Sequence, residues 1–182
     1  MYRMNLVAIG LLLSTLRPIS PAPVHPPTVI LLAQSARDSM NTVFQRYNQH
    51  WDELADLTTL ERMLGTVRPT QLEYLGCLQG SVDQDTVRIE GWMPAADMKQ
   101  LQLAVDGNCD AVPSLVGTWH THPYRADLQN KAVKERALSR QDLATFGASE
   151  LPVTLVMWDV DSVDAAVRAH NSLTHPATVV TR

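Results

Sequence analysis

The stretch Gly117-Thr-Trp-His-Thr-His-Pro123 constrains the fold of this chain more than any other feature. The residues that lead into it predict a strand over residues 114–119, and alternate residues of a strand point to the same side. His120 and His122 are two positions apart, so at the end of this strand both imidazoles can converge on one metal ion. The fold must then hold this strand end beside a further ligand.

Asp142 is the candidate for that ligand. Ser139 and Asp142 open a run that is typical of a helix, and the first turn of a helix can face a neighbouring strand end. Three protein ligands leave a fourth position for water, which distinguishes a catalytic zinc site from a closed structural one. The sequence therefore predicts a single Zn²⁺ per chain, bound by His120, His122 and Asp142.

Hydrophobic periodicity predicts most of the other elements. Apolar residues recur every three or four positions over residues 35–65, which predicts helices with a break near residues 56–59. Alternating residues predict a hairpin over residues 72–80 and 86–92, and an apolar run predicts a strand over residues 152–158.

Two further segments are less regular. Residues 93–108 predict a helix or an irregular crossover, and the polar residues 124–138 predict a solvated surface helix. Residues 163–169 predict a short closing helix or strand.

The N-terminus is expected to be an extension over residues 1–35, followed by one folded domain over residues 36–182. Arg3, the apolar residues 5–16 and the Pro-rich residues 18–27 resemble a signal peptide. Three interpretations stay open: an export signal, a weak anchor, or a chance extension upstream of the true start. The apolar run is shorter than the ~20 residues that span a bilayer, so no stable membrane span is expected.

Charge and cysteine content bear on partners and compartment. Fifteen Lys+Arg against nineteen Asp+Glu give a net charge of −4 without an extended basic stripe, which argues against nucleic acid as a partner. Cys77 and Cys109 are the only cysteines, and they form neither a disulfide framework nor a CxxC motif. They therefore favour a reducing, cytoplasmic compartment, whereas export applies if residues 1–27 are a signal peptide.

Glu73 stands at the entry of the first strand of the expected hairpin. A carboxylate beside Leu75 and Cys77 must be solvated, paired or used in chemistry, because its burial without a partner is costly. Most glutamates in such positions are solvated, so only a partner would give Glu73 a role.

Taken together, these residues resemble the JAMM metallopeptidases, the catalytic branch of the MPN domain, whose pattern is an upstream Glu, then HxHP, then SxxD. Glu73-Tyr-Leu-Gly-Cys-Leu-Gln-Gly80 is similar to the family's E-x-x-G-x-L-x-G strand, and the resemblance covers roughly residues 36–160. The resemblance implies an α/β fold, an MPN/JAMM-like (cytidine-deaminase-like) sandwich of a curved mixed β-sheet flanked by helices.

The spacing departs from the family at one point. The family usually places about seven residues between the second histidine and the serine, whereas sixteen lie between His122 and Ser139. The usual spacing would put the third ligand on Val133, which cannot bind metal. An insertion of about nine residues restores Ser139 and Asp142 to their roles, since surface loops tolerate insertions, and it leaves Asp127 as a rival ligand.

The resemblance implies a zinc-dependent peptidase that hydrolyses a peptide or isopeptide bond, with Glu73 as general base and Ser139 as a donor to the oxyanion. A purely structural N-cap is the alternative for Ser139. Since JAMM relatives often cut after the C-terminal tail of ubiquitin or a ubiquitin-like protein, such a protein or peptide is the implied substrate. The single domain resembles a bacterial stand-alone member. The rival hypotheses are a non-catalytic MPN-type scaffold for protein–protein contacts and a simple zinc-binding module.

Overall fold

The computed structural model describes residues 29–48, 71–101, 103–126, 132–168 and 174–182. The second helix expected before residue 65 and nearly all of the N-terminal extension lie outside these residues. In the described part of the chain, no helix is both long enough and apolar enough to cross a membrane.

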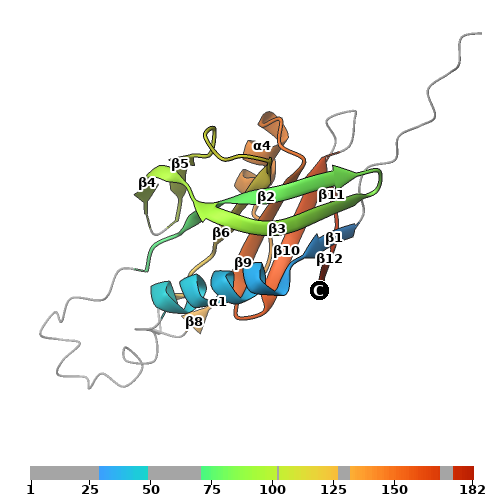
Figure 1. Ribbon diagram of the computed structural model, residues 1–182. Helices are drawn as coiled ribbons and strands as arrows, with labels where there is room; N and C mark the ends of the chain where they lie inside the picture. Colours follow the sequence, from blue (N-terminus) through green and yellow to red (C-terminus); the bar gives the residue numbers. More distant parts are fainter. Residues whose placement is uncertain (1–28, 49–70, 102, 127–131, 169–173) are drawn as a thin grey trace, which may run out of the picture.

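The described residues form a mixed α/β fold with an eight-stranded sheet that is nearly closed, like a barrel (Figure 1). In spatial order its strands are β11 (Thr174–Pro176), β10 (Ser162–Arg168), β9 (Val153–Asp159), β6 (Leu115–Thr121), β2 (Leu75–Asp83), β3 (Thr86–Pro94), β1 (Val29–Leu32) and β12 (Thr178–Thr181). The pairs β6–β9, β1–β3 and β1–β12 are parallel, and the others are antiparallel. The sheet is therefore mixed, as expected.

The two edge strands of this sheet lie close together. They are joined by Ala177 alone, whose N–H donates to the carbonyl of Ala165 in β10 at 3.2 Å. Two small hairpins lie outside the main sheet: β4 (Ala96–Gln100) pairs with β5 (Val105–Asn108), and β7 (Arg125–Ala126) pairs with β8 (Ala132–Val133).

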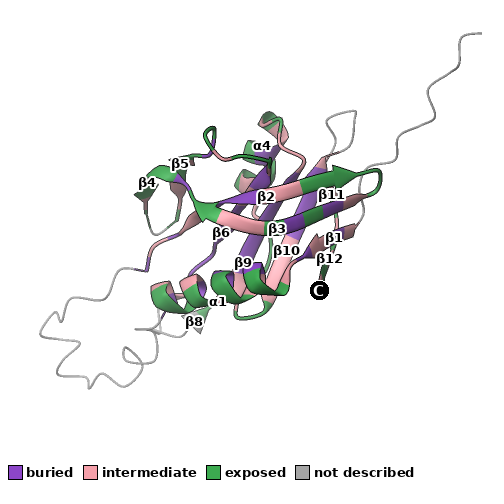
Figure 2. Cartoon of the chain, viewed as in Figure 1, coloured by how far each residue is buried: buried purple, intermediate pink, exposed green. Residues whose placement is uncertain are grey.

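The helices α1 (Gln34–Asn48) and α4 (Arg140–Ala148) pack on opposite faces of the sheet (Figure 1). Met40 and Phe44, one helical turn apart in α1, join the core with Trp119 of β6. His120 follows Trp119 in β6 and points to the other face, where α4 lies. Figure 2 shows buried residues along β6 and β9 and exposed residues on the outer side of α1.

Several expected elements are confirmed, and others differ. The hairpin β2–β3, the strands β6 and β9 and the helices α1 and α4 lie where the sequence predicts them. Residues 93–108 form the end of β3 and the hairpin β4–β5, so the prediction of a helix or crossover is wrong for most of them. Residues 124–138 include the hairpin β7–β8 instead of a surface helix. The sheet also takes in β1, which belongs to the segment assigned to the extension.

The expectation for the cysteines is also wrong. Cys77 and Cys109 form a disulfide bond, with 5.6 Å between their Cα atoms. They are 32 residues apart in sequence, and they meet because β5 ends beside β2. Both lie with Ala95 in a small apolar cluster. The bond ties the hairpin β4–β5 to the main sheet.

Candidate metal centre

Strand pairing brings Glu73 beside His122. The antiparallel ladder between β2 and β6 continues beyond their ends, because Thr121 N–H donates to the Tyr74 carbonyl at 3.0 Å. The Tyr74 N–H in turn donates to Thr121 Oγ1 at 2.9 Å. One step further along this register, Glu73 lies opposite His122, on the face that carries His120.

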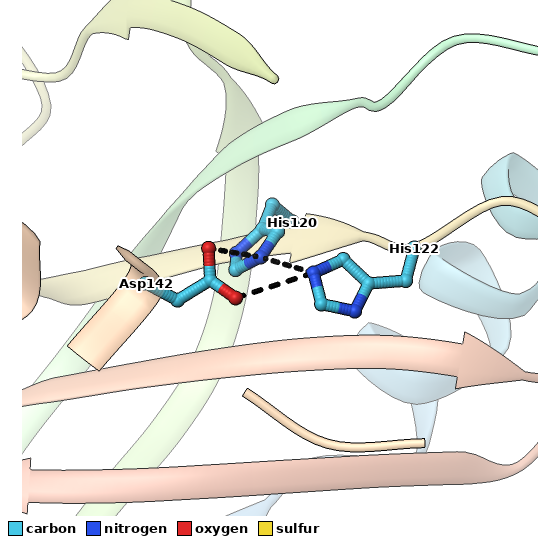
Figure 3. A group of neighbouring side chains, drawn as sticks. All are labelled: His120, His122 and Asp142. Carbon is cyan, nitrogen blue, oxygen red and sulfur yellow. Dashed lines mark hydrogen bonds and ion pairs between the residues drawn. The ribbon is translucent and has the colours of Figure 1, made fainter. Parts of the chain in front are cut away.

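The side chains of His120, His122 and Asp142 converge, as Figure 3 shows. The Nε2 atoms of the two imidazoles are 3.2 Å apart. His120 Nε2 is 3.4 Å from Asp142 Oδ1, and His122 Nε2 is 3.3 Å from Asp142 Oδ2. Zinc–nitrogen bonds of about 2.0–2.1 Å in a tetrahedral site place ligand atoms about 3.3–3.4 Å apart. The two imidazole nitrogens therefore have a spacing close to that of two ligands in a tetrahedral site, and each of them lies near a different oxygen of the Asp142 carboxylate.

The start of α4 holds Asp142 in this position. Ser139 is the N-cap residue, and its Oγ accepts a hydrogen bond from Asp142 N–H at 3.1 Å. In return, the Ser139 N–H donates to Asp142 Oδ2 at 2.7 Å, which completes a capping box. The N-cap role considered for Ser139 is thus confirmed. The same box orients the carboxylate that faces the histidines.

The other end of α4 is held by Arg168 of β10. Its guanidinium donates to the carbonyls of Phe146, Gly147 and Leu151, the last two at 3.3 and 3.2 Å. The carbonyls at the end of a helix have no partners within the helix, and a cation also suits the negative end of its dipole. Arg168 therefore fixes the position of α4 against the sheet.

The charges at the centre shift two pKa values in opposite directions. Burial acts to raise the pKa of Asp142, but hydrogen bonds from His120 and His122 outweigh it and hold this pKa well below its usual range. Burial acts to lower the pKa of His122, but its hydrogen bond with Asp142 and the surrounding carboxylates raise it overall. The candidate ligand Asp142 is therefore ionised at any physiological pH.

Glu73 is buried, with 5% of its surface exposed. Burial is the main cause that raises its pKa to about 7, against the opposing charge of His122. Its backbone is fixed by the hairpin β4–β5, because Glu73 N–H donates to the Leu101 carbonyl at 2.9 Å and Gln100 Nε2 donates to the Glu73 carbonyl at 2.8 Å. A carboxylate with this pKa can both accept and donate a proton near neutral pH.

A cavity of about 600 Å³ opens over these side chains. Glu73, His120, His122 and Asp142 line it together with residues 103–107 of the hairpin β4–β5. Residues of α4, including Phe146, and its N-cap residue Ser139 form another part of the wall. The candidate ligands can therefore be reached by a molecule larger than water.

Two glycines of the sequence motifs are required by close contacts. A Cβ atom on Gly76 would lie 2.0 Å from Nε1 of Trp119, so only glycine leaves room for this indole. A Cβ atom on Gly117 would lie 2.0 Å from the carbonyl oxygen of Val153, across the β6–β9 pair. Both close contacts involve β6, the strand that carries His120 and leads into His122.

The structure brings together Glu73, His120, His122, Ser139 and Asp142, the five residues that the sequence singled out. The rival ligand Asp127 lies outside the described residues. Val133, at the usual family spacing, is an exposed residue of β8. Arg125 and Glu135 also line the cavity, but the sequence did not predict this position for them. Their charges were visible, but a polar segment gives no local signal that separates a solvated face from a cavity wall.

No family model matches the chain, and a search of curated proteins found none that is similar to it. The resemblance to JAMM metallopeptidases therefore rests on the motifs in the sequence.

Proposed function

We propose that this protein is a zinc-dependent metallopeptidase of the JAMM type that hydrolyses a peptide or isopeptide bond. The observation that carries the proposal is the convergence of His120, His122 and Asp142 beside a buried carboxylate in an open cavity. Their imidazole nitrogens are 3.2 Å apart, and each lies within 3.4 Å of an oxygen of Asp142. The mixed sheet with a helix on each face supports the MPN-like fold that the motifs imply.

Zn²⁺ is the metal that suits this donor set, because two imidazoles and one carboxylate with an open fourth position are typical of catalytic zinc. A bound zinc ion would supply Lewis acidity and lower the pKa of a water molecule to about 7. Glu73 then accepts the proton of the attacking water at its carboxylate and returns it to the leaving amine. A pKa of about 7 suits both steps.

Ser139 would donate a hydrogen bond to the oxyanion of the tetrahedral intermediate. Its Oγ already accepts from Asp142 N–H, but this bond leaves the hydroxyl hydrogen available to another acceptor. Removing such a donor costs about 10²–10³ in rate in other hydrolases. The capping and catalytic roles are therefore compatible.

The proposed substrate is the C-terminal tail of a ubiquitin-like protein, or another extended peptide, because JAMM relatives often act on such tails. The cavity volume of about 600 Å³ is large enough for a few residues of an extended chain.

The first test is the zinc content of the wild-type protein purified without added metal, with His122→Ala and Asp142→Ala beside it. We expect about one equivalent of zinc in the wild type and loss in both variants. Asp127→Ala is the matched control and should keep its zinc. Loss of zinc in Asp127→Ala with retention in Asp142→Ala would refute the ligand assignment.

Turnover is tested separately with Glu73→Gln, which should keep zinc but lose about 10²–10⁴ in kcat on any peptide or ubiquitin-like amide that the wild type cleaves. A folded wild type without zinc would favour the scaffold hypothesis. Zinc binding without turnover on such a panel would favour a zinc-binding module.

A further inference from the structure

The hairpin β7–β8, which lies in the inserted segment after His122, is anchored to the rest of the fold. Tyr124 N–H donates to Asn48 Oδ1 in α1 at 2.8 Å. At the end of β9, Asp159 accepts from the Tyr124 hydroxyl and pairs with Lys134, which follows β8. These contacts join the base of the hairpin to α1 and β9, so the side chains beside it have defined positions.

Arg125 of β7 projects from this anchored base into the cavity wall. Its Nη2 atom is 3.0 Å from Glu135 Oε2 and 3.8 Å from Glu73 Oε1. The cavity thus has a guanidinium beside the carboxylate that we propose as general base.

While it pairs with Glu135, the Arg125 guanidinium can still bind another group. The side chains of Arg125 and Glu135 are 32% and 38% exposed, so their ion pair is screened by solvent and weak. A guanidinium carries five N–H donors in a planar fork that suits a carboxylate. Arg125 therefore has the capacity to bind a further carboxylate in the cavity.

The position of Arg125 indicates which part of a substrate it would contact, namely the part on the amine side of the scissile bond. If Glu73 returns a proton to the leaving amine, then the amine departs beside Glu73 and hence beside Arg125. In an amino acid, the amine nitrogen and the carboxylate carbon are about 2.5 Å apart. One leaving residue can therefore contact Glu73 through its amine and Arg125 through its carboxylate, given the 3.8 Å between these two side chains.

We propose that Arg125 is a specificity residue that binds a carboxylate of the leaving group, so that the preferred substrates release an amine that carries one. The inference rests on the proposed peptidase function. The carboxylate can be the α-carboxylate of a C-terminal residue or the side-chain carboxylate of an acidic residue.

Three fluorescein-labelled peptides separate these sources: tetraglycyl-alanine as the free acid, the same peptide as the C-terminal amide, and tetraglycyl-aspartic acid with its α-carboxyl amidated. We expect the wild-type protein loaded with zinc to cleave one or both carboxylate peptides with a KM at least about tenfold below that of the alanine amide. Arg125→Met should abolish this preference by raising the KM of the carboxylate peptides alone. Arg125→Lys, which keeps the charge, should retain part of it.

Arg140→Met is the matched control, because Arg140 also lines the cavity but is an exposed residue at the start of α4. This variant should keep the preference of the wild type. Equal KM values for acid and amide in the wild type, or a preference that Arg125→Met keeps, would overturn the proposal.

Binding of the same peptides, measured by fluorescence anisotropy, separates this inference from the proposed function. If no peptide is cleaved, the peptidase hypothesis fails for this panel, but tighter binding of a carboxylate peptide that disappears in Arg125→Met still supports the assignment. Equal binding of all three peptides, or binding of none, overturns it.

Discussion

The disulfide between Cys77 and Cys109 should contribute substantially to stability. It closes a loop over a sequence separation of 32 residues. In the chain-entropy model, the lost freedom of the unfolded chain for a loop of this length corresponds to about 3.7 kcal/mol at 25 °C. Reduction of the bond should therefore lower the free energy of unfolding by about this amount, with the fold retained.

Urea unfolding of the oxidised and the reduced wild-type protein measures this difference directly. EDTA is present in both samples so that zinc binding does not contribute to stability. With a slope of about 2 kcal/mol/M, the midpoint should fall by roughly 1.8 M urea on reduction.

The double variant Cys77→Ala/Cys109→Ala is the control for the reductant, because its midpoint should be the same in both samples. The urea midpoint of the double variant should be no higher than that of the reduced wild type. Both cysteine side chains are buried in an apolar cluster, and alanine fills less of it. A shift of the wild-type midpoint below about 0.5 M on reduction would contradict the loop-closure argument.

Two further predictions concern the candidate metal centre, and a third concerns the packing of β6 against β9. Zinc affinity should rise with pH and level off above the raised pKa of His122, because zinc must displace its proton while Asp142 is already ionised; a chelator competition that gives a flat profile would contradict this. The kcat/KM of the zinc-loaded protein should rise with pH as Glu73 and the water molecule that zinc would activate lose their protons, and Glu73→Gln should lower kcat/KM along the whole of this limb; a variant profile that matches the wild type would contradict the role of Glu73. Gly117→Ala should lower the free energy of unfolding by about 3 kcal/mol, measured in urea, because its Cβ would lie 2.0 Å from the Val153 carbonyl oxygen; an unchanged midpoint would show that β6 and β9 can separate without cost.

The sequence predicted the convergence of His120, His122 and Asp142 because its signals are local. His120 and His122 share one side of a strand by the period of two, and the structure confirms that they converge. Ser139 and Asp142 form a capping box whose pattern is visible in four consecutive residues. What the sequence could not supply was the contact between the strand and the helix, which the motif order suggested only through the resemblance.

The hairpin β4–β5 was missed because its signal is not local. Met98, Leu101, Leu103 and Val105 stand among polar residues, a pattern that favoured a helix or an irregular crossover over strands. The residues instead form two short strands, with Asp97 at a positive φ of 51° and a register shift between Ala96 and Lys99. Strands this short and irregular carry too few alternations to be recognised.

The disulfide bond also could not be predicted from the sequence, because its two cysteines are far apart in the chain. Nothing in the spacing of Cys77 and Cys109 distinguishes two free thiols from a bond, since their contact depends on β5 ending beside β2. When a chain has only one pair of cysteines, the compartment is a weak guide to whether they form a disulfide bond. Likewise, Arg125 and Glu135 were indistinguishable from solvated charges until the position of the hairpin β7–β8 was known.

The contacts around the site divide its residues into fixed and adaptable groups. His120 and His122 lie on and just after a strand paired on both sides, and Asp142 is held by the capping box while Arg168 anchors its helix. Such support holds the three candidate ligands close together, so that the binding of a metal ion would require little reorganisation. Arg125, in contrast, is held at the cavity by a partly exposed ion pair that a substrate carboxylate can share or replace. Under the proposed function, the fixed residues would carry out the chemistry, and Arg125 at the cavity wall would select the substrate.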